Sequence, residues 1–112
     1  MDGFFEVGLI DDHPVGRARV VQAGALTLAL CRNEKGFFAV DGVCPHRGGP
    51  LGEGDVMGDE IVCPWHFWAF RLDSGETNDP AGPRIGTHEV RIEGNRILIR
   101  PRRTDPEDRG DE

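Results

Sequence analysis

Two short pairs, each of one cysteine and one histidine, lie in the middle of the chain. Cys44 and His46 form the first pair, Cys63 and His66 form the second, and residues 47–62 separate them. A thiolate and an imidazole so close in sequence can bind one inorganic centre, and the long spacer allows two loops to approach it from opposite sides. The pattern therefore predicts a fold in which two loops face each other around a metal site.

Two kinds of metal site use these residue types. In a [2Fe-2S] cluster with mixed ligands, one iron binds two thiolates and the other binds two imidazoles, so each loop should carry one of each. Both loops of this chain do so. A Cys₂His₂ zinc site usually has both cysteines in one pair and both histidines in the other. The alternation therefore favours a cluster, and a structural zinc-binding module is the alternative.

The segments around the two pairs resemble those of a known family. CPHRGGPL at 44–51 and CPWH at 63–66, with the spacing between them, are similar to the ligand segments of Rieske-type [2Fe-2S] proteins. The resemblance implies one cluster per chain, and its ligands would be Cys44, His46, Cys63 and His66. We call residues 44–49 the first loop and 64–67 the second loop. The resemblance also implies that a proline-rich third loop, residues 78–83, covers the cluster.

Other residues near the two pairs are expected to surround the cluster. Gly48 and Gly49 keep the first loop free of side chains, so backbone N–H groups can point at sulfur, although turn geometry alone also explains them. Trp65 and Phe67 can shield the cluster from water or form an apolar rim for a redox partner. The residues that we expect to line or cover the cluster are Arg47, Gly48, Gly49, Leu51, Trp65, Phe67, Trp68, Pro80 and Pro83.

The rest of the chain has the pattern of short β-strands. No segment shows a sustained apolar period of 3.6 residues, and Gly, Pro, Asn and Asp interrupt the apolar runs. The predicted strands cover residues 4–9, 16–22, 25–32, 36–41, 55–57, 60–63, 67–72, 87–93 and 96–100. We therefore predict an all-β, Rieske-like antiparallel β-sandwich in a single domain over 1–100. A small cluster-binding subdomain is expected at about 43–84, and a polar, disordered tail at 101–112.

Strand faces give more specific predictions. Leu26, Leu28 and Leu30 alternate with small residues, which predicts a half-buried strand with its leucine face in the core. Trp68 and Phe70 should share a face with His66 and pack behind the cluster. The apolar residues of the last two strands that should return to the core are Val90, Ile92, Ile97 and Ile99.

The remaining histidines and the third cysteine fit structural roles better than ligation. His88 shares a strand face with Val90, so we predict a histidine with its hydrogen bonds satisfied rather than a further ligand. His13 precedes Pro14 in a turn and is expected in solvent. Cys31 lies among small residues on its strand and is expected to be a packed thiol.

Composition limits the classes of function. The formal net charge of −7 at pH 7 disfavours nucleic acid as a partner, because phosphate binding needs clustered Lys and Arg. No run of residues is long and apolar enough to span a membrane, and the start of the chain does not resemble an export signal. One cysteine left outside the metal site favours a reducing compartment. We therefore expect a cytoplasmic protein that is monomeric when free.

The resemblance narrows the function to a stand-alone ferredoxin. The length of 112 residues leaves no room for the additional iron domain of a Rieske oxygenase. Length and the CPHRGGPL segment are similar to the ferredoxin components of ring-hydroxylating dioxygenases. They are also similar to the small subunit of NAD(P)H-dependent assimilatory nitrite reductase. All four ligands are present, which favours a carrier between an NAD(P)H-dependent flavoprotein reductase and a terminal oxygenase.

The sequence also predicts a low reduction potential. Two ferric ions, two sulfides, two thiolates and two neutral imidazoles sum to zero charge, so the cluster becomes −1 on reduction. High-potential Rieske proteins, as the resemblance has it, carry a disulfide between the loops and Ser and Tyr hydroxyls that donate to cluster sulfur. This chain has Trp65 and Trp68 at two of those positions and contains no tyrosine.

Overall fold

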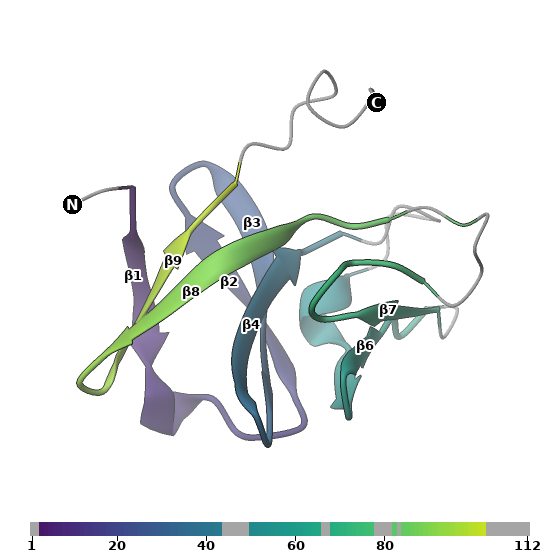
Figure 1. Ribbon diagram of the computed structural model, residues 1–112, viewed down its shortest axis with the longest axis horizontal. Coiled ribbons are helices and arrows are strands. Elements are labelled where there is room, and N and C mark those ends of the chain that lie inside the picture. The colour runs from purple at the N-terminus through teal and green to yellow at the C-terminus, as the bar shows by residue number, and fades with distance from the viewer. Residues whose placement is uncertain (1–2, 44–49, 66–67, 78–81, 83, 103–112) are drawn as a thin grey trace.

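The computed structural model describes residues 3–43, 50–65, 68–77, 82 and 84–102, which form two antiparallel sheets (Figure 1). The larger sheet has the order β1-β9-β8-β4-β3-β2 and the smaller has the order β5-β6-β7. The strands are β1 (Phe5–Leu9), β2 (Ala18–Ala23), β3 (Leu26–Asn33), β4 (Gly36–Asp41), β5 (Asp55–Met57), β6 (Glu60–Val62), β7 (Ala69–Arg71), β8 (Thr87–Glu93) and β9 (Arg96–Arg100). The all-β prediction is confirmed.

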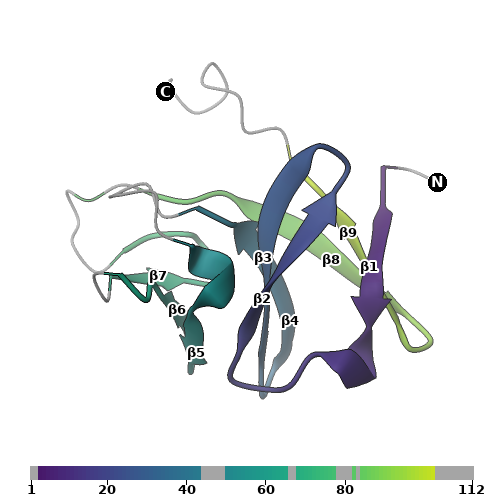
Figure 2. The ribbon, with the colours of Figure 1, turned by 180° about the vertical axis from the view of Figure 1, so that it is seen from behind.

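The smaller sheet is built from the chain between β4 and β8, and it lies to one side of the larger sheet (Figure 1). Two 3-10 helices, η1 (Ile10–Asp12) and η2 (Leu51–Glu53), complete the described elements. Seen from behind, η2 lies between the smaller sheet and strands β2 and β3 (Figure 2). Within the described residues, no helix has the length and apolar character needed to cross a membrane.

Tight turns connect the hairpins where the sequence predicts them. Met57 pairs with Glu60, which leaves Gly58 and the following residue as a two-residue turn. The turn between β8 and β9 at Gly94 has the same form. Both glycines have positive φ angles, 62° and 64°, which is the backbone region that two-residue hairpin turns require and that glycine adopts without strain.

The buried side chains form two clusters, one on each face of β3. The first cluster lies within the larger sheet and consists of Val21, Ala23, Leu28, Leu30, Ala39, Ile97 and Ile99. The second cluster joins the two sheets and consists of Ala18, Ala29, Cys31, Val40, Leu51, Val56, Ile61, Cys63, Phe70, Leu72 and Ile85. Alternate residues of β3 therefore enter different clusters, as the period of two in a strand requires.

The prediction of a half-buried β3 is wrong. Leu28 and Leu30 lie in one cluster, but Ala29 and Cys31 on the opposite face are also fully buried. The smaller sheet covers this second face, and the small side chains there allow close packing. Leu26, the first residue of the strand on the leucine face, is 38% exposed, so the prediction that it lies in the core is also wrong.

The predictions for the last hairpin are largely confirmed. Ile97 and Ile99 are fully buried, and Val90 packs partly buried against the same cluster. The prediction for Ile92 is wrong, since it is 43% exposed. Ile92 lies next to the turn that connects β8 and β9, where the last three residues of β8 are exposed.

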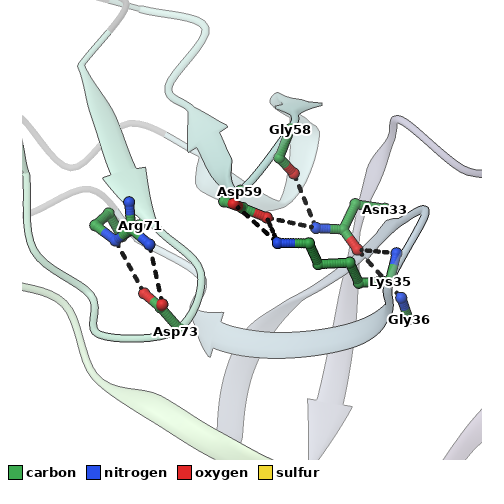
Figure 3. A network of polar contacts seen from close by, with 7 residues as sticks. All are labelled: Asn33, Lys35, Gly36, Gly58, Asp59, Arg71 and Asp73. Carbon is green, nitrogen blue, oxygen red and sulfur yellow. Dashed lines mark hydrogen bonds and ion pairs between the residues drawn. The ribbon is translucent and has the colours of Figure 1, made fainter.

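One buried asparagine fastens the turns of the two sheets to each other (Figure 3). Asn33 Oδ1 accepts the backbone N–H groups of Lys35 (2.8 Å) and Gly36 (3.1 Å) within the β3–β4 turn. Its Nδ2 donates to the Gly58 carbonyl (2.8 Å) and to Asp59 Oδ1 (3.4 Å) in the β5–β6 turn. The Lys35 ammonium adds an exposed ion pair to Asp59 at 3.2 Å. The smaller sheet is thus held to the larger one at this turn as well as through the shared cluster.

Candidate metal centre

The first loop lies outside the described residues, but the residues that flank it pair with each other. Val43 and Pro50 form an antiparallel bridge. Just beyond it, the Leu51 N–H donates to the Gly42 carbonyl at 3.0 Å. The bridge between Val43 and Pro50 therefore fixes both ends of the segment between β4 and η2. The predicted ligands Cys44 and His46 lie between these two residues in sequence.

A backbone hydrogen bond from the predicted ligand Cys63 joins the two ends of the second loop. The Cys63 N–H donates to the Trp68 carbonyl at 2.8 Å, which continues the β6–β7 pairing by one step beyond Val62 and Ala69. Cys63 is fully buried. The backbone of Cys63 is thus fixed at the base of the segment that contains His66.

The third loop is also flanked by paired residues. Glu76 and Arg84 form a bridge, and their side chains form an ion pair at 2.6 Å. The Ile85 N–H donates to the Gly75 carbonyl at 2.9 Å. Gly75 has a φ of 79°, and a Cβ atom there would collide with the Ile85 carbonyl, so the close approach requires glycine.

One packed cluster supports the ends of all three loops. Leu51 follows the first loop, Cys63 precedes the second and Ile85 follows the third, and all three belong to the cluster that joins the sheets. Trp68 packs partly buried against the same cluster, with its ring centroid 6.3 Å from that of the fully buried Phe70. Phe70 is buried in the core as predicted, while Trp68 is only partly buried. Because His66 lies outside the described residues, the shared face with His66 and the position behind the cluster stay predictions.

The two described cysteines differ in what they can do. Burial raises the pKa of the Cys31 thiol to about 12, and its Sγ lies 3.9 Å from the Ala29 carbonyl. Cys31 is therefore a protonated, packed thiol, as predicted. Cys63 is a free thiol held at the base of the second loop. A buried thiol on a fixed backbone, outside any disulfide in the described structure, fits the donor set of an iron-sulfur cluster.

The structure describes four of the predicted site residues. Leu51 and Cys63 are fully buried, Trp68 is partly buried and Trp65 is 57% exposed. The other predicted site residues lie outside the described residues, and their roles stay predictions: Cys44, His46, Arg47, Gly48, Gly49, His66, Phe67, Pro80 and Pro83.

The two described histidines have different environments. The side chain of His88 is fully buried, with Nε2 2.9 Å from Asp41 Oδ1 and Nδ1 accepting the Arg102 N–H at 3.0 Å. Its predicted structural role is confirmed. The prediction that His13 lies in solvent is wrong, since it is only 7% exposed and its ring packs edge-on against Phe37. Burial lowers the pKa of His13, and the Arg19 charge contributes in the same direction.

Sequence reasoning missed Asp41. This residue ends β4, three positions before Cys44, and its carboxylate accepts from the Gly86 N–H (2.8 Å) as well as facing His88. An acidic residue at a strand end next to a ligand segment is a weak signal. Its two partners lie more than forty positions away in sequence.

Comparisons with known proteins agree with this arrangement. A family model described as the Rieske [2Fe-2S] domain matches residues 3–92. The ferredoxin component of the alkene monooxygenase system of Xanthobacter autotrophicus is 32% identical over 97 residues, which cover 86% of this chain and 80% of that protein. Several longer relatives are matched over only 15% to 22% of their length.

Solved structures share the fold along nearly the whole chain. A structure of the complex of reduced oxygenase and oxidized ferredoxin in carbazole 1,9a-dioxygenase includes a chain with a TM-score of 0.81 and 28% identity, which covers 93% of this chain and 98% of that one. An NADH-dependent nitrite reductase small subunit from Mycobacterium tuberculosis has a TM-score of 0.82 and 23% identity, covering 90% and 96%. At 23% identity, the likeness to the nitrite reductase small subunit shows a shared fold alone.

Proposed function

This chain belongs to the Rieske [2Fe-2S] domain family, and we propose that it carries single electrons from an NAD(P)H-dependent flavoprotein reductase to a terminal oxygenase. The observation that carries the proposal is the 32% identity to a monooxygenase ferredoxin component, which extends over 80% of that protein. The similarity therefore extends over most of both chains.

The Rieske domain carries one [2Fe-2S] cluster, which supplies a centre that accepts and returns one electron. We assign its ligation to Cys44, His46, Cys63 and His66. The hydrophobic cluster that joins the two sheets keeps water away from the base of the second loop, because Leu51, Cys63 and Ile85 are all buried. We further propose that residues 43–84 form the cluster-binding subdomain.

We propose that the redox partners contact an apolar rim beside the ligand pairs. Val43 precedes Cys44 and is 53% exposed, and Trp65 precedes His66 and is 57% exposed. Two large apolar side chains in solvent next to the ligand positions favour a docking role over a shielding role for Trp65. The net charge of −7 favours partners whose docking faces are basic around this rim.

A second candidate function is the small subunit of an NAD(P)H-dependent assimilatory nitrite reductase. The fold likeness to such a subunit, with a TM-score of 0.82, favours it, while the ferredoxin component is the relative of higher sequence identity. In both proposals the protein is cytoplasmic, binds neither nucleic acid nor membrane, and is monomeric when free.

Purification from the native host under reducing conditions tests the choice of partner. We expect the reconstituted protein to be reduced by a flavoprotein reductase with NADH or NADPH and to be reoxidised by an oxygenase that co-purifies with it. Stable co-purification with a large sirohaem-containing chain would instead support nitrite reduction. A Trp65→Ala variant should slow transfer to the partner without changing the visible spectrum of the cluster.

A further inference from the structure

The carboxylate of Asp41 ties together the strand that leads into the first loop and the strand that follows the third loop. Strands β4 and β8 pair at Ala39 with His88 and at Val40 with Thr87. The Asp41 N–H extends this ladder to the Gly86 carbonyl at 3.0 Å. The Asp41 side chain makes a second contact to the same residue, because Asp41 Oδ2 accepts the Gly86 N–H at 2.8 Å.

His88 holds the other oxygen of this carboxylate. Because the Arg102 backbone N–H donates to Nδ1 (3.0 Å), the proton of the neutral imidazole is assigned to Nε2, which donates to Asp41 Oδ1 at 2.9 Å. The imidazole is fully buried, whereas the side chain of Asp41 remains 25% exposed. The histidine thus fixes the orientation of a charged group rather than serving as a ligand itself.

The position of Asp41 in the chain places this charge close to the cluster ligands. Three Cα steps of about 3.8 Å separate it from Cys44, so their Cα atoms are at most about 11 Å apart. Reduction makes the cluster more negative by one unit. A fixed carboxylate nearby therefore opposes the entry of the electron.

We infer that Asp41, oriented by His88, is a positioning residue that lowers the reduction potential of the cluster and holds the end of β4, which leads into the first loop, against the start of β8. At about 12 Å and an effective dielectric constant of about 20, one unit charge changes the reduction equilibrium about tenfold. A tenfold change corresponds to about 59 mV for a one-electron couple. The inference requires the cluster but does not depend on which reductase or oxygenase is the partner.

The test measures the midpoint potential of the cluster-loaded protein by film voltammetry at neutral pH. Asp41→Asn removes the charge while keeping a side chain of the same shape, and it should raise the potential by about 59 mV, a tenfold change in the equilibrium. Glu93→Gln is the matched control, because it removes one charge from the same strand as His88. Glu93 lies at the hairpin turn, at the end of the larger sheet away from the smaller sheet (Figure 1). We expect the control to leave the potential within about a fifth of that shift, because its exposed charge is screened by solvent and salt. Equal shifts in the two variants would overturn the inference.

Two variants of His88 separate charge from mere structural damage. His88→Phe removes the donor but keeps the charge of Asp41, so the carboxylate is less compensated and the potential should fall, in contrast to the rise in Asp41→Asn. His88→Gln can still donate to the carboxylate and accept the Arg102 N–H, and it should restore the wild-type potential. All variants should keep the electron paramagnetic resonance spectrum of a Rieske cluster. If Asp41→Asn does not hold a cluster, the His88 pair decides: a potential unchanged in both Phe and Gln variants would refute the role of the carboxylate.

Discussion

Replacing Asn33 with alanine should weaken the joint between the two sheets more than any exposed contact nearby. The side chain is 7% exposed and makes four hydrogen bonds, two within its own turn and two to the β5–β6 turn (Figure 3). A hydrogen bond in a folded protein contributes roughly 0.5–1.5 kcal/mol net. The bond to Asp59 at 3.4 Å is long, and water can partly replace Asn33 at the two turn N–H groups.

We therefore expect Asn33→Ala to lower the free energy of unfolding by about 2–3 kcal/mol. For a domain of this size, that corresponds to a drop in Tm of roughly 8–15 °C. Urea unfolding of the cluster-loaded protein, followed by far-ultraviolet circular dichroism, measures the first quantity, and a thermal scan measures the second. Visible absorbance in the same samples reports whether the cluster is lost in the same transition.

The matched control is Lys35→Met in the same turn. The Lys35 side chain is 71% exposed and forms an ion pair with Asp59 at 3.2 Å, which should contribute less than about 1 kcal/mol. A loss of stability in Asn33→Ala no larger than that in Lys35→Met would refute the reasoning. It would mean that the shared hydrophobic cluster and the backbone bridge between Arg17 and Asp55 join the sheets without a large contribution from Asn33.

Four further predictions concern the cluster, the loops and pH. Replacing His46 or His66 with alanine should abolish the Rieske electron paramagnetic resonance spectrum, whereas His88→Gln should retain it; a normal spectrum in either of the first two variants would exclude that residue as a ligand. Burial lowers the pKa of His13, so protonation favours the unfolded chain, and the contribution of His13 to stability is complete above pH about 6.5 and is lost as the pH falls below it. In urea unfolding at several pH values, His13→Phe should therefore lose less stability than the wild type below pH about 6.5; the same loss in both proteins would show that another group is responsible. Without metal, amide exchange should increase at the loops while the larger sheet stays protected; loss of protection throughout would show that the larger sheet does not fold alone. The midpoint potential should lie near the bottom of the roughly −150 to +300 mV range of Rieske centres, and a value above about +100 mV would contradict the argument from missing hydroxyl donors.

Local signals in the sequence were sufficient for the hairpins. A glycine followed by a polar residue at 58–59 and at 94–95 lies between short apolar runs, and both turns form where they were predicted. The alternation in β3 was also read correctly as a strand. Its second buried face could not be predicted, because the residues that cover Ala29 and Cys31 come from η2, β5, β6 and β7.

Long-range partners explain the two errors at polar residues. His13 was expected in solvent because its neighbours, Asp12 and Pro14, are typical of an exposed turn. Its burial depends on Phe37, which belongs to a different hairpin. The Asp41 carboxylate was missed for the same reason, since its partner His88 is 47 positions away. Spacing within a segment predicts ligand pairs, but it carries no information about which strand a side chain will face.

The lengths of the strands suggest where binding of the cluster has its largest effect on stability. Strands β5, β6 and β7 have three residues each, shorter than the five or six that are usual, and a sheet of this size is not stable by itself. It is held by the packing of Ile61 and Phe70 against β3 and by the Asn33 joint. The second loop connects β6 to β7 and carries Cys63 at its base, while the first loop begins at the end of β4. A cluster ligated from both loops therefore links the smaller sheet directly to the larger one, and its binding free energy stabilises the part of the fold that has the fewest contacts of its own.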